Sequence, residues 1–252
     1  MCGRYCISSA PEAVRRLFRY LEQPNFPPRY NVAPTQPVPI VRLVEGRRHF
    51  ALVRWGLIPS WVKDPSAFTL LINARGESVN DKPAFRAAMK RRRCLFPADG
   101  FYEWKAVGGR KQPYVARRKG GGLIAFAGLW ETWTGPNGEE METAAIITTD
   151  ANKTLSAVHH RAPVIVPPEA FDFWLDTDKV DAKTAAAVIA PAPEGSMEAY
   201  EVSPAVNRVA NDSPALIEPY RAEAARAAAP APVTAAKPKR SKGKTNAQGT
   251  LF

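Results

Sequence analysis

The chain has 252 residues, 45% of them hydrophobic, and a formal net charge of +11 at pH 7. Its apolar content allows a buried core in one large domain or two small ones, but no stretch is long enough to span a membrane. Three cysteines argue against a disulfide framework, and the polar, arginine-bearing start carries no secretory signal. We therefore expect a cytoplasmic, nucleoid-associated protein whose positive charge favours a polyanionic partner, nucleic acid first.

Short elements joined by turns are expected in this chain, which contains 24 prolines. A first helix is predicted over residues 10–22, because Ser9 and Glu12 form a capping-box pattern before apolar residues at helical spacing. Runs of β-branched and aromatic residues then predict strands at Val38–Val44, His49–Trp55, Pro113–Arg117, Leu123–Leu129, Thr143–Thr149 and Val164–Val166. Further helical patterns lie at Ala84–Arg91, Pro168–Leu175 and Ala182–Ile189. Since helices and strands do not alternate in βαβ units, we predict an α+β fold with a mainly antiparallel, curled or barrel-like sheet and flanking helices.

Cys2 directly follows Met1, so removal of Met1 would place an α-amine and a thiol on one residue. Such a residue can react with an aldehyde, because the amine forms a Schiff base and the thiol then closes a five-membered thiazolidine. An α-amine with a pKa near ~8 is also less protonated at neutral pH than a lysine near ~10.4. The alternative is a structural cysteine hidden in an edge strand.

Two segments in the first third of the chain hold function-capable side chains. Tyr30–Thr35 contains Asn31, whose alternative role is to stabilise a turn. Arg54–Trp61 runs from a predicted strand into a loop with two tryptophans and an arginine, a mixture suited to stacking on bases and pairing with phosphate. We expect one of its two tryptophans to lie in the core.

Later segments add polar and titratable side chains. Asn73 and Arg75 share a face if the chain is extended, although an ordinary polar edge is the alternative. Glu103 lies among bulky aromatic residues, which suits acid–base chemistry if the carboxylate is partly buried. His159 and His160 point opposite ways in extended backbone, so one of them would face a given site. Since no metal-ligand spacing accompanies them, we predict no metal site and no cofactor, and favour an imidazole near a thiol.

Taken together and in this order, these segments resemble the SOS-response-associated peptidase (SRAP) family. The resemblance covers roughly Cys2 to Tyr220 and rests on Cys-Gly-Arg-Tyr, Tyr-Asn-Val-Ala-Pro-Thr, Arg-Trp-Gly-Leu-Ile-Pro-Ser-Trp, Asn-Ala-Arg-Gly-Glu, Gly-Phe-Tyr-Glu-Trp and His-His-Arg-Ala-Pro. It implies the SRAP fold and a protein that binds single-stranded DNA at abasic sites, attaching its N-terminal cysteine to the ring-opened sugar aldehyde. The last motif departs from the family's usual His-x-Arg-Met-Pro, because Ala162 takes the fourth position.

The resemblance also implies roles for individual residues. Four catalytic residues supply the amine and thiol, position them, and transfer protons: Cys2, Asn73, Glu103 and His159. Five residues bind DNA, two of them by holding the flanking phosphates (Arg75 and Arg161), with Arg4, Asn31 and Trp61 completing the set. The implied function is to sense and shield abasic sites through a thiazolidine crosslink, with Schiff-base lyase activity as a branch.

Other functions remain open at this stage. The family's name suggests a thiol peptidase acting on itself or on others. A glutamine amidohydrolase with an N-terminal nucleophile also begins Met-Cys-Gly. Noncatalytic binding of single-stranded DNA would give affinity without any need for the Cys2 thiol.

The composition changes after about Tyr220, where alanine, proline and lysine replace the mixed apolar pattern. Residues 1–221 are therefore predicted to form the catalytic and DNA-binding domain, and residues 222–252 a disordered basic tail. The tail ends in Gln-Gly-Thr-Leu-Phe, which resembles the short motif with which bacterial proteins bind the sliding clamp. Gln248, Leu251 and Phe252 form this candidate motif.

Overall fold

The structure is a computed structural model that describes residues 2–220. The strands in this part of the chain are β1 (Tyr5–Ile7), β2 (Arg29–Val32), β3 (Pro37–Val44), β4 (Arg47–Trp55), β5 (Asn73–Arg75), β6 (Arg93–Ala98), β7 (Gly100–Val107), β8 (Arg110–Arg118), β9 (Ile124–Thr134), β10 (Glu140–Asp150), β11 (Arg161–Pro163) and β12 (Met197–Glu201). The helices are α1 (Pro11–Phe18), α2 (Pro83–Arg91), α3 (Lys153–Ser156), α4 (Phe171–Leu175) and α5 (Ala182–Ala185). Short 3-10 turns are η1 (Gly76–Ser78), η2 (Pro168–Ala170), η3 (Ala186–Val188), η4 (Pro204–Asn207) and η5 (Pro214–Ile217).

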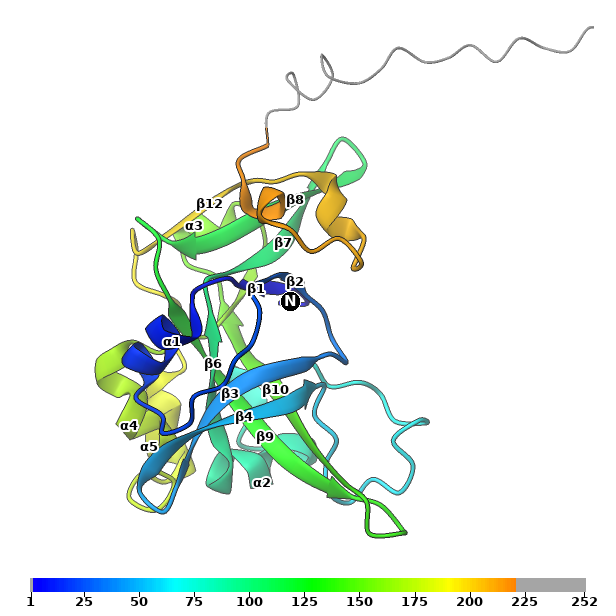
Figure 1. Cartoon of the computed structure of the whole chain (residues 1–252), viewed down its shortest axis with the longest axis vertical. Coiled ribbons are helices and arrows are strands. Elements are labelled where there is room, and N and C mark those ends of the chain that lie inside the picture. The colour runs from blue at the N-terminus through cyan, green and yellow to red at the C-terminus, as the bar shows by residue number, and fades with distance from the viewer. Residues whose placement is uncertain (1, 221–252) are drawn as a thin grey trace, which may run out of the picture. The chain divides into compact units, whose positions relative to one another are not determined.

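Five strands close into a barrel-like sheet. β3 pairs with β4 and β6, β6 pairs with β9, β9 pairs with β10, and β10 pairs with β4. All of these pairings are antiparallel except β10 with β4. Closure leaves no free edge among the five strands, and their inward side chains, such as Trp55, Phe126 and Ile146, join the main hydrophobic core. The predicted α+β fold with a mainly antiparallel, barrel-like sheet is confirmed (Figure 1).

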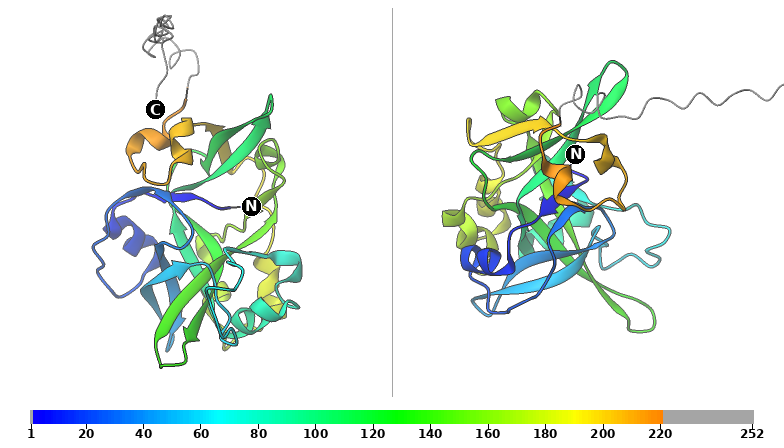
Figure 2. Two further views of the ribbon diagram at one scale, coloured as in Figure 1. Left: turned by 90° about the vertical axis from the view of Figure 1, so that its right-hand side faces the viewer. Right: turned by 45° about the horizontal axis from the view of Figure 1, so that its top comes forward.

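A second sheet, in the order β12-β8-β7-β1-β2, packs onto this barrel. In Figures 1 and 2, β1 and β2 lie between the β7–β8 hairpin and the barrel strands β3 and β4. The ring of Tyr5, on β1, meets Trp55 and Phe126 edge-on, with ring centroids 5.4 Å and 6.0 Å apart. The backbone of β1 therefore belongs to the second sheet, whereas the side chain of Tyr5 packs in the barrel core.

The first helix is shorter than predicted, and the capping-box prediction is wrong. α1 begins at Pro11, and its N-cap residue Ala10 makes no side-chain capping bond. The hydroxyl of Ser9 donates instead to Asp99 Oδ1 over 2.5 Å, and the Ser9 amide donates to Asp99 Oδ2 over 2.8 Å. Proline at the first helical position has no N–H to satisfy, so the helix can start without Ser9 as its cap.

Several other predicted elements are refined by the structure. The helix expected at 84–91 corresponds to α2, whereas the two later helical patterns each combine one 3-10 turn with one short helix, η2 with α4 and α5 with η3. The strand expected at 164–166 is displaced, because β11 ends at Pro163 and Ile165 forms only an isolated bridge to Phe126. No helix in residues 2–220 is long and apolar enough to cross a membrane. The predicted tail at 222–252 and its clamp motif lie outside the described residues.

Candidate active site around Cys2

Cys2 precedes strand β1 and lies near Glu103 because β1 pairs with β7. Tyr5 pairs with Phe101, and the Tyr102 amide donates to the Arg4 carbonyl over 2.9 Å. Continued by one residue, this antiparallel register sets Gly3, the neighbour of Cys2, opposite Glu103. Both functional side chains are buried, with Cys2 0% and Glu103 6% exposed.

The surroundings of the Cys2 thiol favour its protonated form. Burial raises the pKa of this thiol well above its ordinary value, and the nearby charge of Glu103 raises it further. The thiol is therefore neutral at physiological pH, unlike the activated thiolate of many cysteine enzymes. A nucleophile at this position needs a group that removes its proton as it reacts.

Asn73 holds the backbone of Cys2 through a side-chain hydrogen bond. β5 lies parallel to β10, with Asn73 beside Ile146, and the Asn73 side-chain Nδ2 donates to the Cys2 carbonyl oxygen over 2.8 Å. The other amide atom, Asn73 Oδ1, is buried and meets no donor among the described residues. Since buried acceptors are nearly always satisfied in folded proteins, this oxygen is available to a donor brought by a substrate or by the amine of Cys2.

His159 approaches from the turn that follows α3. Its backbone amide donates to the Leu155 carbonyl over 3.0 Å, and its side chain lines a small pocket together with Glu103 and Tyr114. The prediction that His159 and His160 point opposite ways is wrong, because this segment is a turn and their rings stack with centroids 4.4 Å apart. The structure thus brings Asn73 into contact with Cys2, sets Glu103 near the Cys2 thiol, and places His159 in a pocket shared with Glu103.

Arg4 and Asn31 hold a loop over the second sheet. Arg4 Nη1 donates to Asn31 Oδ1 over 2.6 Å and to the Val206 carbonyl over 2.9 Å. The Asn31 Nδ2 atom lies 2.7 Å to 3.2 Å from the carbonyl oxygens of Val206, Arg208 and Asn211. Asn31 is buried, so its side chain shapes the loop at residues 204–211, which sequence reasoning did not single out.

Trp61 and Arg75 have exposed side chains. Trp61 is 59% exposed in the loop after β4 and meets Phe68 edge-on at 5.7 Å, whereas Trp55 is fully buried. The prediction that one of these tryptophans is a core residue is confirmed. Arg75 is exposed at the end of β5, two residues after Asn73. An aromatic face and a cation are therefore both open to solvent, the cation on the same strand as Asn73.

Arg161 is placed differently from Arg75. Its side chain is only 11% exposed and forms ion pairs with Glu77 and Asp150. Neither carboxylate was singled out from the sequence, although Glu77 closes the Asn-Ala-Arg-Gly-Glu motif. The structure therefore gives Arg161 acidic neighbours at the position where the resemblance implies a phosphate.

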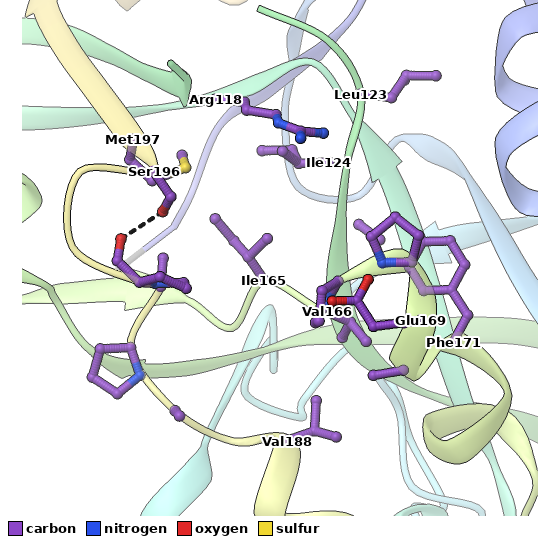
Figure 3. Close-up of a pocket in the computed structure, with 18 of the residues that line it drawn as sticks. Arg118, Leu123, Ile124, Ile165, Val166, Glu169, Phe171, Val188, Ser196 and Met197 are labelled. Atoms are coloured by element: carbon purple, nitrogen blue, oxygen red, sulfur yellow. Dashed lines mark hydrogen bonds between the residues drawn. The ribbon is translucent and has the colours of Figure 1, made fainter. Parts of the chain in front are cut away.

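A larger cavity of about 500 Å³ contains none of the predicted site residues. Figure 3 shows its mostly apolar lining, including Ile165, Val188 and Phe171, with Arg118 and Glu169 as its titratable side chains. The pocket lined by Glu103 and His159 is much smaller, and Cys2 itself is fully buried. The predicted catalytic residues therefore lie outside the larger cavity.

Comparison with known proteins places the chain in a family. The family model for SOS response associated peptidase (SRAP) matches residues 1–209. The abasic site processing protein YoqW of Bacillus subtilis (strain 168) is 38% identical over 224 residues, which cover 87% of this chain and 100% of YoqW. The abasic site processing protein HMCES of Gallus gallus is 32% identical over 266 residues, covering 87% of this chain and 78% of HMCES.

A solved structure has the same architecture. The crystal structure of a Bacteroides thetaiotaomicron protein aligns with a TM-score of 0.80 at 26% sequence identity, covering 87% of this chain and all of that one. The matches in sequence and in fold extend over the barrel, the second sheet and the Cys2 site described above. This chain belongs to the SOS response associated peptidase (SRAP) family.

Proposed function

We propose that this protein recognises abasic sites in single-stranded DNA and joins to them covalently through Cys2 once Met1 has been removed. The bond from Asn73 to the Cys2 carbonyl carries the proposal, because it fixes the residue that bears both nucleophiles beside a buried carboxylate. The relatives YoqW and HMCES, both described as abasic site processing proteins, support the choice of DNA lesion. The product would shield the lesion as a DNA–protein crosslink.

The proposed reaction is a condensation. The α-amine of Cys2 adds to the aldehyde carbon of the ring-opened sugar, and the carbinolamine loses its hydroxyl as water to leave a C=N bond. The thiol sulfur then adds to the same carbon, and the thiol proton ends on the nitrogen. One water is lost in total, and nothing is oxidised or reduced.

The described side chains supply what this chemistry needs. Asn73 Oδ1, buried and without a donor among residues 2–220, is placed to accept a hydrogen bond from the amine. Glu103 and His159 share a pocket and would transfer protons to the departing hydroxyl and away from the neutral thiol. A thiol with a raised pKa reacts only when a base takes its proton, and the carboxylate of Glu103 near it supports the proposal of such a base.

The exposed Trp61 and Arg75 are proposed to hold the flanking nucleotides by stacking and by phosphate contact. Arg4 and Asn31 would act on the DNA through the loop they anchor. The net charge of +11 favours a polyanion. Gln248, Leu251 and Phe252 are proposed to bind the sliding clamp, and a pull-down in which their deletion leaves clamp recovery unchanged would refute that part.

Two related activities would also use Cys2. The Schiff base can eliminate the 3′ phosphate before the thiol closes, so slow closure would make the protein an abasic-site lyase. A thiol peptidase, as the family description suggests, would need Cys2 but no abasic site. The dependence on the lesion therefore separates the proposed crosslink from peptidase activity.

Denaturing gel electrophoresis tests the proposal. The purified protein, with loss of Met1 confirmed by intact mass, is mixed with a single-stranded oligonucleotide bearing one abasic site. We expect a heat-stable band of protein plus DNA that disappears for Cys2→Ala and for an intact oligonucleotide. The matched variant Cys6→Ala, which alters another buried cysteine, should retain the band. Absence of the band in the wild-type protein would refute the proposed function.

A further inference from the structure

Three side chains form a row across the second sheet. Glu103 on β7 pairs with Tyr114 on β8, and Tyr114 pairs with Glu201 on β12. Residues directly opposite each other on antiparallel strands point to the same face, with Cβ atoms about 4.5–5.5 Å apart. Tyr114 therefore lies between two carboxylates, of which that of Glu103 is buried and that of Glu201 is partly exposed.

A small pocket lies over this row. Glu103 and Tyr114 line it from the sheet, and Leu155, Val158 and His159 line it from α3 and the turn that follows. Its volume is about 10 Å³, which is roughly the space that a single water molecule needs. The Tyr114 side chain is therefore part of the wall that closes the surroundings of Glu103, and a smaller side chain at this position would make room for water.

The hydroxyl of Tyr114 is anchored by Glu201. It donates a hydrogen bond to Glu201 Oε1 over 2.7 Å. Burial and this hydrogen bond raise the pKa of Tyr114 to about 12, so the hydroxyl keeps its proton at neutral pH and remains the donor. Hydrogen bonds to a carboxylate are shorter and stronger than those between neutral groups. Glu201 therefore holds the tyrosine ring in the orientation in which it borders the pocket.

We propose that Tyr114, anchored by Glu201, is a positioning residue that fixes the orientation of the Glu103 carboxylate and keeps bulk water from it. A carboxylate transfers protons efficiently only while it stays within hydrogen-bond reach of the reacting group. With a smaller side chain at position 114, Glu103 would sample more orientations and proton transfer would slow. The role in crosslinking rests on the proposed function, whereas the effect of Tyr114 on the surroundings of Glu103 is a property of the folded protein.

Tyr200 offers a matched control in the same sheet. It precedes Glu201 on β12, so its side chain points to the opposite face, and its hydroxyl donates to the Ile217 carbonyl over 2.7 Å. Tyr200→Phe and Tyr114→Phe each remove one tyrosine hydroxyl that forms a 2.7 Å hydrogen bond, but only Tyr114 lies opposite Glu103. A difference between the two variants therefore reports on the Glu103 pocket and not on a general loss of stability.

The first measurement is single-turnover crosslinking at increasing protein concentration, with the abasic oligonucleotide limiting. Tyr114→Phe should lower the maximal rate about fivefold through loss of the hydrogen bond, and Tyr114→Leu should lower it about tenfold or more. The protein concentration that gives half the maximal rate should be unchanged, since the contacts with DNA are kept. Tyr200→Phe should crosslink at the wild-type rate. A wild-type maximal rate in Tyr114→Leu, or a change in the half-saturating concentration alone, would overturn the positioning role.

The anchoring part of the proposal is tested by combining variants. Glu201→Leu should slow crosslinking as much as Tyr114→Phe, because both changes remove the same hydrogen bond. The double variant should then be no slower than either single variant. Multiplied effects in the double variant would show that Glu201 does not act through Tyr114.

The second measurement needs no reaction. In the ¹³C NMR spectrum, the side-chain carboxyl signal of Glu103 is assigned by its loss in Glu103→Gln. Tyr114→Leu should shift this signal, because the aromatic ring is replaced and water enters the pocket, whereas Tyr200→Phe should leave it in place. An unchanged signal in Tyr114→Leu would overturn the positioning role. If the wild-type protein forms no crosslink, the proposed function fails, while the signal still decides whether Tyr114 sets the surroundings of Glu103.

Discussion

The side chain of Asn73 donates a hydrogen bond to the carbonyl oxygen of Cys2 over 2.8 Å, which joins β5 to the segment that precedes β1. We predict that Asn73→Ala slows crosslinking about tenfold, since one hydrogen bond is worth about 0.5–1.5 kcal/mol and 1.36 kcal/mol corresponds to tenfold in rate. Single-turnover kinetics with excess protein measure this rate. Asn137→Ala, in an exposed turn, is the control, and equal rates for the two variants would contradict the role of Asn73.

The buried thiols predict a loss of stability in alkali. Burial raises the pKa of Cys2, Cys6 and Cys94 above their ordinary value of 9.0. Above about pH 9 the unfolded chain releases these protons and the native protein retains them, so the free energy of unfolding falls by about 1.4 kcal/mol per pH unit for each thiol. Below pH 9 the contribution of the thiols is complete and constant.

Urea denaturation between pH 7.5 and 10 measures this slope. Cys94→Ala removes one thiol and should reduce the slope above pH 9 by up to about 1.4 kcal/mol per pH unit, whatever its effect on stability at neutral pH. Equal slopes for the wild-type protein and Cys94→Ala would show that Cys94 titrates alike in the folded and unfolded states.

Arg93 is predicted to stabilise the fold without binding DNA. It is buried and donates to the carbonyl oxygens of Trp174, Met89, Asp176 and Val180, so only part of the basic run at residues 90–93 is open to DNA. Arg93→Met should lower the free energy of unfolding by about 3 kcal/mol, because four buried or partly buried carbonyl oxygens lose their donor.

Arg91→Met is the matched variant for this test, since Arg91 is exposed at the end of α2. It should leave the free energy of unfolding within about 0.5 kcal/mol of the wild-type value. Chemical denaturation of both variants decides the point. Equal losses of stability in the two variants would mean that the carbonyl bonds of Arg93 contribute nothing.

Asn31 is predicted to restrain the loop at residues 204–211. Its amide meets three carbonyl oxygens of this loop, and Arg208, exposed within it, is a site for trypsin. Asn31→Ala should speed cleavage after Arg208 several-fold, because the loop opens more often when these bonds are lost. Mass spectrometry of timed digests follows the cut, and cleavage at the wild-type rate would argue against this restraint.

The sequence predicted the longer elements because their patterns repeat over several residues. β3, β4, β9 and β10 were recognised from apolar runs, whereas β1, β5 and β11 have only three residues each, too few for a periodic signal. Ser9 was assigned to a helix cap because the sequence does not show that Asp99, ninety residues later, binds it. Long-range partners of this kind are set by topology and have no local pattern.

The site was predictable to a similar extent. The motifs singled out Cys2, Asn73, Glu103 and His159 as chemically capable, but their convergence depends on the pairing of β5 and β11 with β10 and of β1 with β7. The acidic partners of Arg161 could not be predicted, since an arginine in a motif is equally suited to a phosphate or a carboxylate.

The chemistry of the link between Cys2 and the abasic site is tested most directly by the intact mass of the product, formed with and without borohydride. A thiazolidine should give the mass of the Met1-less protein plus the oligonucleotide minus one water, survive heating, and be unaffected by borohydride. Cys2→Ser is the informative variant, because it keeps the α-amine and lacks the thiol; its Schiff base should be recovered only after borohydride reduction. A wild-type adduct that likewise required borohydride would contradict thiol closure, and with it the central claim.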